Sequence, residues 1–214
     1  LLILPVILLI TSMGARSREQ AEPIYISVGV PLTGPWSTLG EEIQRGVELA
    51  VAQINESGGL LGRPMGVLVG DTESDPKVAA RLARQWSADP AIFAQIGGFA
   101  SAPTLAAQRI YHASGVLQIS PSVGHHAFAA GSPWSFSMVG LNEGEGRSNA
   151  RYAFRELAAR RAAVLFHDGE WGRRVSTEFE REFAELGGSV VAKAFYFAAE
   201  SQYEEILSSI RQSN

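Results

Sequence analysis

The stretch Gly97-Gly-Phe-Ala-Ser-Ala-Pro-Thr104 decides the fold of this chain, because an apolar run leads into it and a helical pattern leads out of it. The run 91–96 predicts a buried strand, and the two glycines allow the backbone to turn sharply. Ser101 is expected to cap a helix that ends near Gly115. A strand end then meets a helix start, where free N–H groups and the helix dipole favour a small anionic group.

Strands and helices alternate on both sides of this stretch. Thr38 and Glu41 have the spacing of a capping box, and Asp75 followed by Pro76 is a favourable helix start. The apolar patterns predict strands at 24–30, 65–69, 91–96, 116–120, 135–139, 162–166 and 189–195, with a loop at 121–133. Helices are predicted between them, the later ones at 148–160, at 173–186 and from Tyr203 onward. This alternation is typical of an α/β fold with parallel sheets and helices on both faces.

The glycine- and acid-rich stretch around 140–146 is predicted to cross between two domains. Only two clear strands follow it, and two parallel strands cannot cover three amphipathic helices or protect their own edges. We therefore predict a complete first domain at 24–140, a crossing at 141–147 and an incomplete second domain at 148–214.

The first ten residues are almost entirely apolar, and small and polar residues follow them. The apolar run is shorter than the roughly 20 residues that a helix needs to cross a bilayer of about 30 Å. This pattern predicts a signal peptide and leader at 1–23, and hence a periplasmic or other extracytoplasmic location. The alternative is an uncleaved N-terminal anchor. A lipoprotein anchor is not expected, because no cysteine follows the apolar run.

The composition argues against several classes of function. The formal net charge is −4 and no basic cluster stands out, so nucleic acid is not an expected partner. The chain has no cysteine, and it contains neither a GxxxxGK nor a GxSxG motif. His125 and His126 have no third metal ligand at a recognisable spacing, and the neighbours His167 and Asp168 do not make a catalytic pair. We therefore expect no enzymatic activity, no cofactor and no metal.

A series of short motifs, in this order and spacing, resembles the periplasmic solute-binding proteins of ABC importers of the leucine/isoleucine/valine-binding type. The motifs lie at 29–35, 46–55, 58–64, 71–76, 96–97, 119–121 and 167–172. The resemblance implies a type I periplasmic-binding fold, in which two α/β lobes joined by three crossings close on a ligand. By this comparison the chain holds the complete first lobe, a doubly wound parallel sheet, and the start of the second.

The resemblance also implies a ligand site. In this family a serine at the helix start after the third strand binds the ligand, and Ser101 matches it. A small-small-Thr triplet follows the fourth strand, and here it falls on Ser122, Val123 and Gly124. The family's threonine is thus a glycine, and losing a hydrogen bond to a charged group costs about 1.5–3 kcal/mol. A ligand other than an α-amino acid therefore becomes plausible.

Trp171 matches an aromatic residue that the second lobe brings across the cleft, and the first loop supplies Trp36 and Leu39. Helix capping alone for Ser101, and packing alone for the two tryptophans, remain the simpler alternatives. The complete predicted ligand site consists of Trp36, Leu39, Phe99, Ala100, Ser101, Ser122, Val123, Gly124 and Trp171.

We expect a monomeric, exported substrate-binding component of an ABC importer. It would bind a small polar solute, such as a branched-chain amino acid, an amide or a related small acid, and deliver it to a membrane permease. The alternative is a ligand-sensing domain of a receptor or regulator with the same fold. An α/β enzyme is a third possibility, for which the sequence offers no set of catalytic residues.

Overall fold

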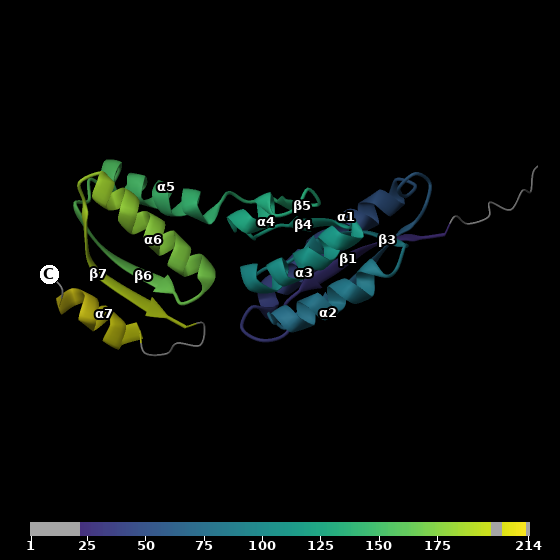
Figure 1. Cartoon of the computed structure of the whole chain (residues 1–214), viewed down its shortest axis with the longest axis horizontal. Helices are drawn as coiled ribbons and strands as arrows, with labels where there is room; N and C mark the ends of the chain where they lie inside the picture. The colour runs from purple at the N-terminus through teal and green to yellow at the C-terminus, as the bar shows by residue number, and fades with distance from the viewer. Residues whose placement is uncertain (1–21, 198–202, 213–214) are drawn as a thin grey trace, which may run out of the picture.

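The computed structural model describes residues 22–197 and 203–212, and it confirms the alternation of strands and helices. The elements form two parallel sheets with helices around them (Figure 1). Residues 1–21, which hold most of the predicted signal peptide and leader, lie outside the described residues. The elements are β1 (Ile24–Val30), α1 (Ser37–Glu56), β2 (Met65–Asp71), α2 (Pro76–Ser87), β3 (Ile92–Gly97), α3 (Ser101–Ser114), β4 (Leu117–Ser120), α4 (His126–Ala130), β5 (Ser135–Ser137), α5 (Asn142–Arg155), β6 (Arg161–His167), α6 (Glu170–Glu185), β7 (Ser189–Tyr196) and α7 (Tyr203–Gln212).

The larger sheet has five parallel strands in the order β2-β1-β3-β4-β5. Helix α1 packs on one face, where Val47 and Val51 contact the apolar residues of β1 and β2. Helices α2 and α3 cover the other face. All five strands point the same way, so Asp71, Gly97 and Ser120 end their strands at one edge of the sheet. The residues predicted to bind a ligand follow at this edge.

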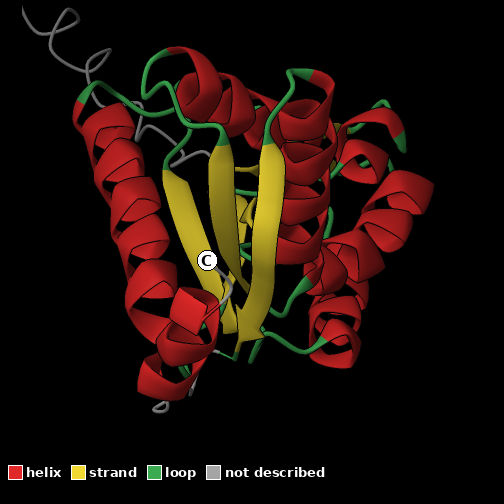
Figure 2. Cartoon of the chain, turned by 90° about the vertical axis from the view of Figure 1, so that its left-hand side faces the viewer, coloured by secondary structure: helices red, strands yellow, loops and turns green. Residues whose placement is uncertain are grey.

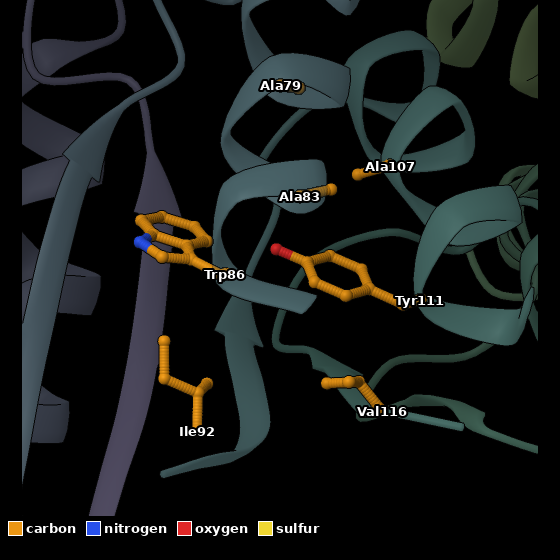
Figure 3. Close-up of a cluster of buried hydrophobic side chains, with 7 residues drawn as sticks. All are labelled: Ala79, Ala83, Trp86, Ile92, Ala107, Tyr111 and Val116. Atoms are coloured by element: carbon orange, nitrogen blue, oxygen red, sulfur yellow. The ribbon is translucent and has the colours of Figure 1, made fainter. Parts of the chain in front are cut away.

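The core under α2 and α3 contains two large side chains, Trp86 and Tyr111 (Figure 3). They lie above Ile92 and Val116, and alanines on both helices allow the helices to approach. Burial raises the pKa of the Tyr111 hydroxyl, and a hydrogen bond with Ser27 partly offsets this effect. Trp86 is only 6% exposed.

The smaller sheet pairs β6 with β7 in parallel. Viewed from its end, the molecule shows helices on both sides of the strands (Figure 2). Helix α6 packs against both strands and against α5, while α7 contacts β7. Phe183 of α6 is fully buried, with Phe154 edge-on and Phe179 stacked beside it. Among the described residues, no helix is both long and apolar enough to span a membrane.

Two predicted helix caps are wrong. Helix α1 begins at Ser37, one residue before the predicted capping box, and its N-cap residue makes no side-chain hydrogen bond. Helix α3 begins at Ser101 itself, so Ala100 holds the extended N-cap position. The Asp75 cap is confirmed, because its carboxylate accepts hydrogen bonds from the N–H groups of Lys77 and Val78.

Several boundaries differ from the predictions. The expected loop after β4 contains the short helix α4, and β5 ends at Ser137. Helix α5 starts at Asn142, so most of the stretch predicted as a crossing is helical. Glu143 and Glu145 lie in its first turn, where acidic side chains stabilise the helix dipole and offset the cost of the glycines. The assignment of 141–147 as a crossing between domains stays a prediction.

Candidate functional site

The edge of the larger sheet is shaped by Gly97 and Gly98. Both have positive φ, 137° and 84°, a region that favours glycine. A Cβ atom at Gly97 would lie 2.6 Å from the carbonyl oxygen of Gly29, and one at Gly98 would lie 2.4 Å from Thr104 Oγ1. The Gly98 N–H donates to the same Gly29 carbonyl at 2.8 Å. The two glycines therefore permit a turn that a larger residue could not make, which brings the start of α3 close to β1.

The loop after β4 is hydrogen-bonded to this turn. The Ser120 hydroxyl donates to the Gly98 carbonyl at 2.9 Å, and the Ser122 hydroxyl lies 3.1 Å from the carbonyl oxygens of both Gly98 and Phe99. Val123 is buried, and its N–H donates to Ser120 Oγ at 3.0 Å. Because the Ser122 hydroxyl donates its hydrogen to the backbone, its oxygen lone pairs can accept a hydrogen bond from a ligand.

Gly124 has no room for a side chain. Its carbonyl accepts a hydrogen bond from the Asn142 N–H at 2.8 Å. A Cβ atom on Gly124 would lie 2.4 Å from Asn142 Oδ1 and 2.4 Å from the Gly140 carbonyl oxygen. The resemblance predicts a threonine at position 124, but here the start of α5 approaches so closely that only glycine fits. Asn142, which makes this approach, is a site residue that sequence reasoning missed.

Trp36 lies between the two sheets. Its ring centroid is 5.4 Å from that of Phe99, and 5.7 Å from that of His167 at the end of β6. The His167 ring meets Trp36 edge-on, at an interplanar angle of 77°. Leu39 is 37% exposed on the first turn of α1. Trp36 and Phe99, both predicted site residues, therefore contact each other, and Trp36 also contacts the smaller sheet.

Trp171 lies in the first turn of α6, because this helix starts at Glu170 and not at the predicted residue 173. Its indole N–H donates to Glu145 Oε2 at 3.0 Å, and the side chain is 48% exposed. It lines an open cleft of about 560 Å³ together with Ser122, Asn142, Glu145 and Ser148. Ser122 and Trp171 are thus on the wall of one cleft, and Glu145 is its one charged residue among those described.

Ser101 and Ala100 are placed at the start of α3, next to Phe99, and are not among the residues that line this cleft. At the start of this helix, the Thr104 hydroxyl donates a hydrogen bond to the Ala100 carbonyl oxygen at 2.7 Å. The role of Ser101 toward a ligand stays a prediction.

His125 joins the loop after β4 to α6. Its Nδ1 accepts the Ala127 N–H at 3.1 Å, so the ring proton is on Nε2, which donates to Glu170 Oε1 at 2.7 Å. His126 stacks on His125 and lies 3.5 Å from Glu143. The two histidines therefore pair with carboxylates of α5 and α6, and the described residues hold no cluster of three side chains suited to a metal. The sequence around the two histidines did not predict that they pair with Glu170 and Glu143.

Asp71 holds the loop that carries Trp36. Burial by itself would raise its pKa, but hydrogen bonds from the Leu32 N–H, the Thr33 hydroxyl and the Glu73 N–H outweigh this effect, and the pKa is lowered. The Leu32 bond is 2.8 Å long and the Thr33 bond 2.7 Å. The ionised carboxylate therefore connects the end of β2 to the loop between β1 and α1.

Comparisons of the sequence agree with this architecture. The model of a family described as periplasmic binding protein matches residues 23–214. The Leu/Ile/Val-binding protein homolog 1 of Brucella abortus is 27% identical over 191 residues, which are 89% of this chain and 51% of that protein. A leucine-, isoleucine-, valine-, threonine- and alanine-binding protein of Pseudomonas aeruginosa is 26% identical over 93% of this chain and 53% of its own length. The chain spans about half the length of these relatives.

Solved structures show the same fold. A leucine binding protein from Thermotoga maritima superimposes with a TM-score of 0.79 at 26% identity, over 89% of this chain and 54% of that one. An isoleucine-bound branched-chain amino acid substrate-binding protein from Streptococcus pneumoniae gives a TM-score of 0.81 at 24% identity, over 88% of this chain and 54% of its own. The fold class predicted from the sequence is thereby confirmed.

Proposed function

The chain belongs to the periplasmic binding protein family, and from that premise we propose that it is part of an exported substrate-binding component of an ABC importer. Its ligand would be a small polar solute, such as a branched-chain amino acid, an amide or a related small acid, which it delivers to a membrane permease. The relatives named above are binding proteins for such amino acids, which supports this class of ligand.

The observation that carries the proposal is the placement of Ser122 and Trp171 on one cleft of about 560 Å³. The Ser122 oxygen can accept a hydrogen bond, and the exposed Trp171 indole offers an apolar face beside the Glu145 carboxylate. A ligand with both an apolar part and an N–H group fits these surroundings. The proposal keeps Phe99, Ala100 and Ser101 as further ligand contacts, together with Trp36 at the N-cap of α1 and Leu39 in its first turn, although none of these five lines the cleft itself.

Binding would favour the arrangement in which the two sheets are in contact. The ligand touches Ser122 from the larger sheet and Trp171 from the smaller one, so its contacts are complete only when both are in place. The His125–Glu170 hydrogen bond and the Trp36–His167 ring contact join the same two parts and would add to this preference.

Calorimetric screening tests the proposal, with branched-chain amino acids, their amides, urea and aromatic acids as candidates. A ligand present at about 100 times its Kd should stabilise the protein by roughly 2.7 kcal/mol. Trp171→Ala should weaken binding at least tenfold, because it removes the aromatic wall. Trp134→Ala, which changes a similarly exposed tryptophan away from the cleft, should leave binding unchanged. If no small solute binds or raises the melting temperature, the proposal is wrong.

A further inference from the structure

A row of polar side chains crosses the core of the larger sheet. The strand register pairs Ser27 of β1 with Gln95 of β3, Gln95 with Gln118 of β4, and Gln118 with Ser135 of β5. All four residues are buried, and the two glutamines are 3% and 1% exposed. Glutamine is an unusual choice for the middle of a parallel sheet, where strands are otherwise apolar on both faces.

The two glutamines line a small cavity between the sheet and helices α2 and α3. The rings of Trp86 and Tyr111 also line it, the Tyr111 hydroxyl being hydrogen-bonded with Ser27, and Gly98 and Phe99 line it on the side of the sheet edge that holds the candidate site. Its volume is about 20 Å³. A cavity of that size holds one water molecule and is far too small for a solute.

The side-chain oxygens of Gln95 and Gln118 are both buried, and neither has a hydrogen-bond partner among the described residues. Buried acceptors in native proteins are almost always paired, either with protein groups or with ordered water. The glutamines are neighbours on adjacent strands, so one guest between them could donate a hydrogen bond to each oxygen. The guest must therefore be small and carry two donor hydrogens.

We propose that one buried water molecule occupies this cavity and bridges the side-chain oxygens of Gln95 and Gln118. Water is favoured over a small cation because none of the lining side chains is charged, and an uncompensated buried charge is far more costly than a neutral guest. The water lies directly behind Gly98 and Phe99, whose carbonyl groups accept the Ser122 hydroxyl on the other side. It thus supports the turn that carries the candidate ligand site.

A crystal structure at better than about 1.5 Å resolution would test this. We expect a well-ordered water within about 2.7–3.2 Å of both glutamine oxygens. Two results would overturn the proposal: a cavity without ordered density while the surrounding side chains are well defined, or a direct hydrogen bond between the two glutamine side chains that closes the space. Density for a metal ion at shorter distances would overturn it as well.

Magnetic relaxation dispersion of water oxygen-17 gives a second readout, because it counts water molecules that exchange slowly with solvent. Gln118→Met keeps the length of the side chain but removes the acceptor, and it should lose one slowly exchanging water relative to the unchanged protein. Gln53→Met, the same change on the exposed surface of α1, should lose none. An unchanged count in folded Gln118→Met contradicts the proposal. If that variant does not fold, Gln95→Met serves the same purpose, and the crystal test does not depend on either.

Discussion

The two sheets of this molecule are stabilised in different ways. Among the described residues, every hydrophobic side chain that is fully or almost fully buried lies in the part built on the larger sheet, except Ala150 and Phe183. In the smaller part, α5 and α6 are joined by the buried Ala150, by the contact between the Phe154 and Phe183 rings, and by ion pairs such as Arg151 with Glu182 at 2.7 Å. Buried apolar area stabilises more than partly exposed ion pairs do. We therefore expect the larger sheet to unfold last and the smaller part to open first.

The largest expected effect comes from the core of the larger sheet. Trp86→Ala removes a 6%-exposed indole that packs between α2 and the sheet, and it should lower the free energy of unfolding by about 3–5 kcal/mol. Denaturant unfolding followed by circular dichroism measures this loss. Hydrogen exchange should show faster exchange throughout β1, β3, α2 and α3, because these elements share the cluster.

Trp134→Ala is the matched control for this change, because Trp134 is 43% exposed and its truncation leaves no cavity. Trp134→Ala should lower the free energy of unfolding by well under half as much as Trp86→Ala does. Equal losses from the two tryptophan variants would mean that burial does not distinguish these sites, and the proposed difference between the two sheets would then lose its basis.

Phe183→Ala probes the smaller part and should lower its local free energy of unfolding by about 3 kcal/mol, because it removes a fully buried ring that Phe154 and Phe179 contact. Hydrogen exchange should increase in α5, α6, β6 and β7 and stay unchanged in β1, β3 and β4. An equal increase in both sheets would show that the molecule unfolds as one cooperative unit and that the smaller part does not open first.

Much of the fold could be predicted because its signals are local. Apolar runs of strand length and helical spacing placed nearly all the strands and helices, and Asp75 before Pro76 marked the start of α2 correctly. The sequence does not predict the start of α5, because three glycines favour a loop there, whereas Glu143 and Glu145 stabilise the N-terminus of the helix. The cap at Ser101 was wrong because Ala100 takes that position without any side-chain bond.

The candidate site was predicted only in part, for the same reason. Ser122 and Trp171 line one cleft, which a resemblance could indicate. Sequence reasoning missed Asn142, Glu145 and Glu170. Each of them is hydrogen-bonded to a residue far away in the chain, and no local sequence pattern predicts such a contact. The sequence shows that Gly124 lacks the threonine hydroxyl, but only the structure shows that Asn142 occupies the space next to it.

Gly124→Thr tests the contact between the two parts directly. The new Cβ would lie 2.4 Å from Asn142 Oδ1 and from the Gly140 carbonyl oxygen, so the start of α5 must shift. We expect a loss of about 1–3 kcal/mol, measured by thermal unfolding, because overpacking forces the backbone to move. Gly46→Ala on the exposed face of α1 meets no atom within 4 Å and should instead be neutral or slightly stabilising. A Gly124→Thr variant as stable as the parent would show that the two parts are only loosely joined here.

The smallest effect is expected at Asp71, within the more stable part. Asp71→Asn keeps the shape but replaces one acceptor oxygen with a donor, and it should cost about 1–2 kcal/mol at neutral pH by weakening the bonds from Leu32, Thr33 and Glu73. Folding lowers the pKa of Asp71. The stability that its ionised carboxylate contributes is therefore fully present above the pKa that Asp71 has in the unfolded chain, which is about 4. This stability is lost as the pH falls through the lower pKa of the folded state. The difference in stability between parent and variant should therefore shrink in acid.

The control is Asp89→Asn, at a carboxylate that accepts one hydrogen bond from the Ala91 N–H, and it should lower the free energy of unfolding by less. A difference between parent and Asp71→Asn that stays constant from pH 7 to pH 3 would contradict the role assigned to the ionised carboxylate. In that case, shape alone would hold the loop that carries Trp36.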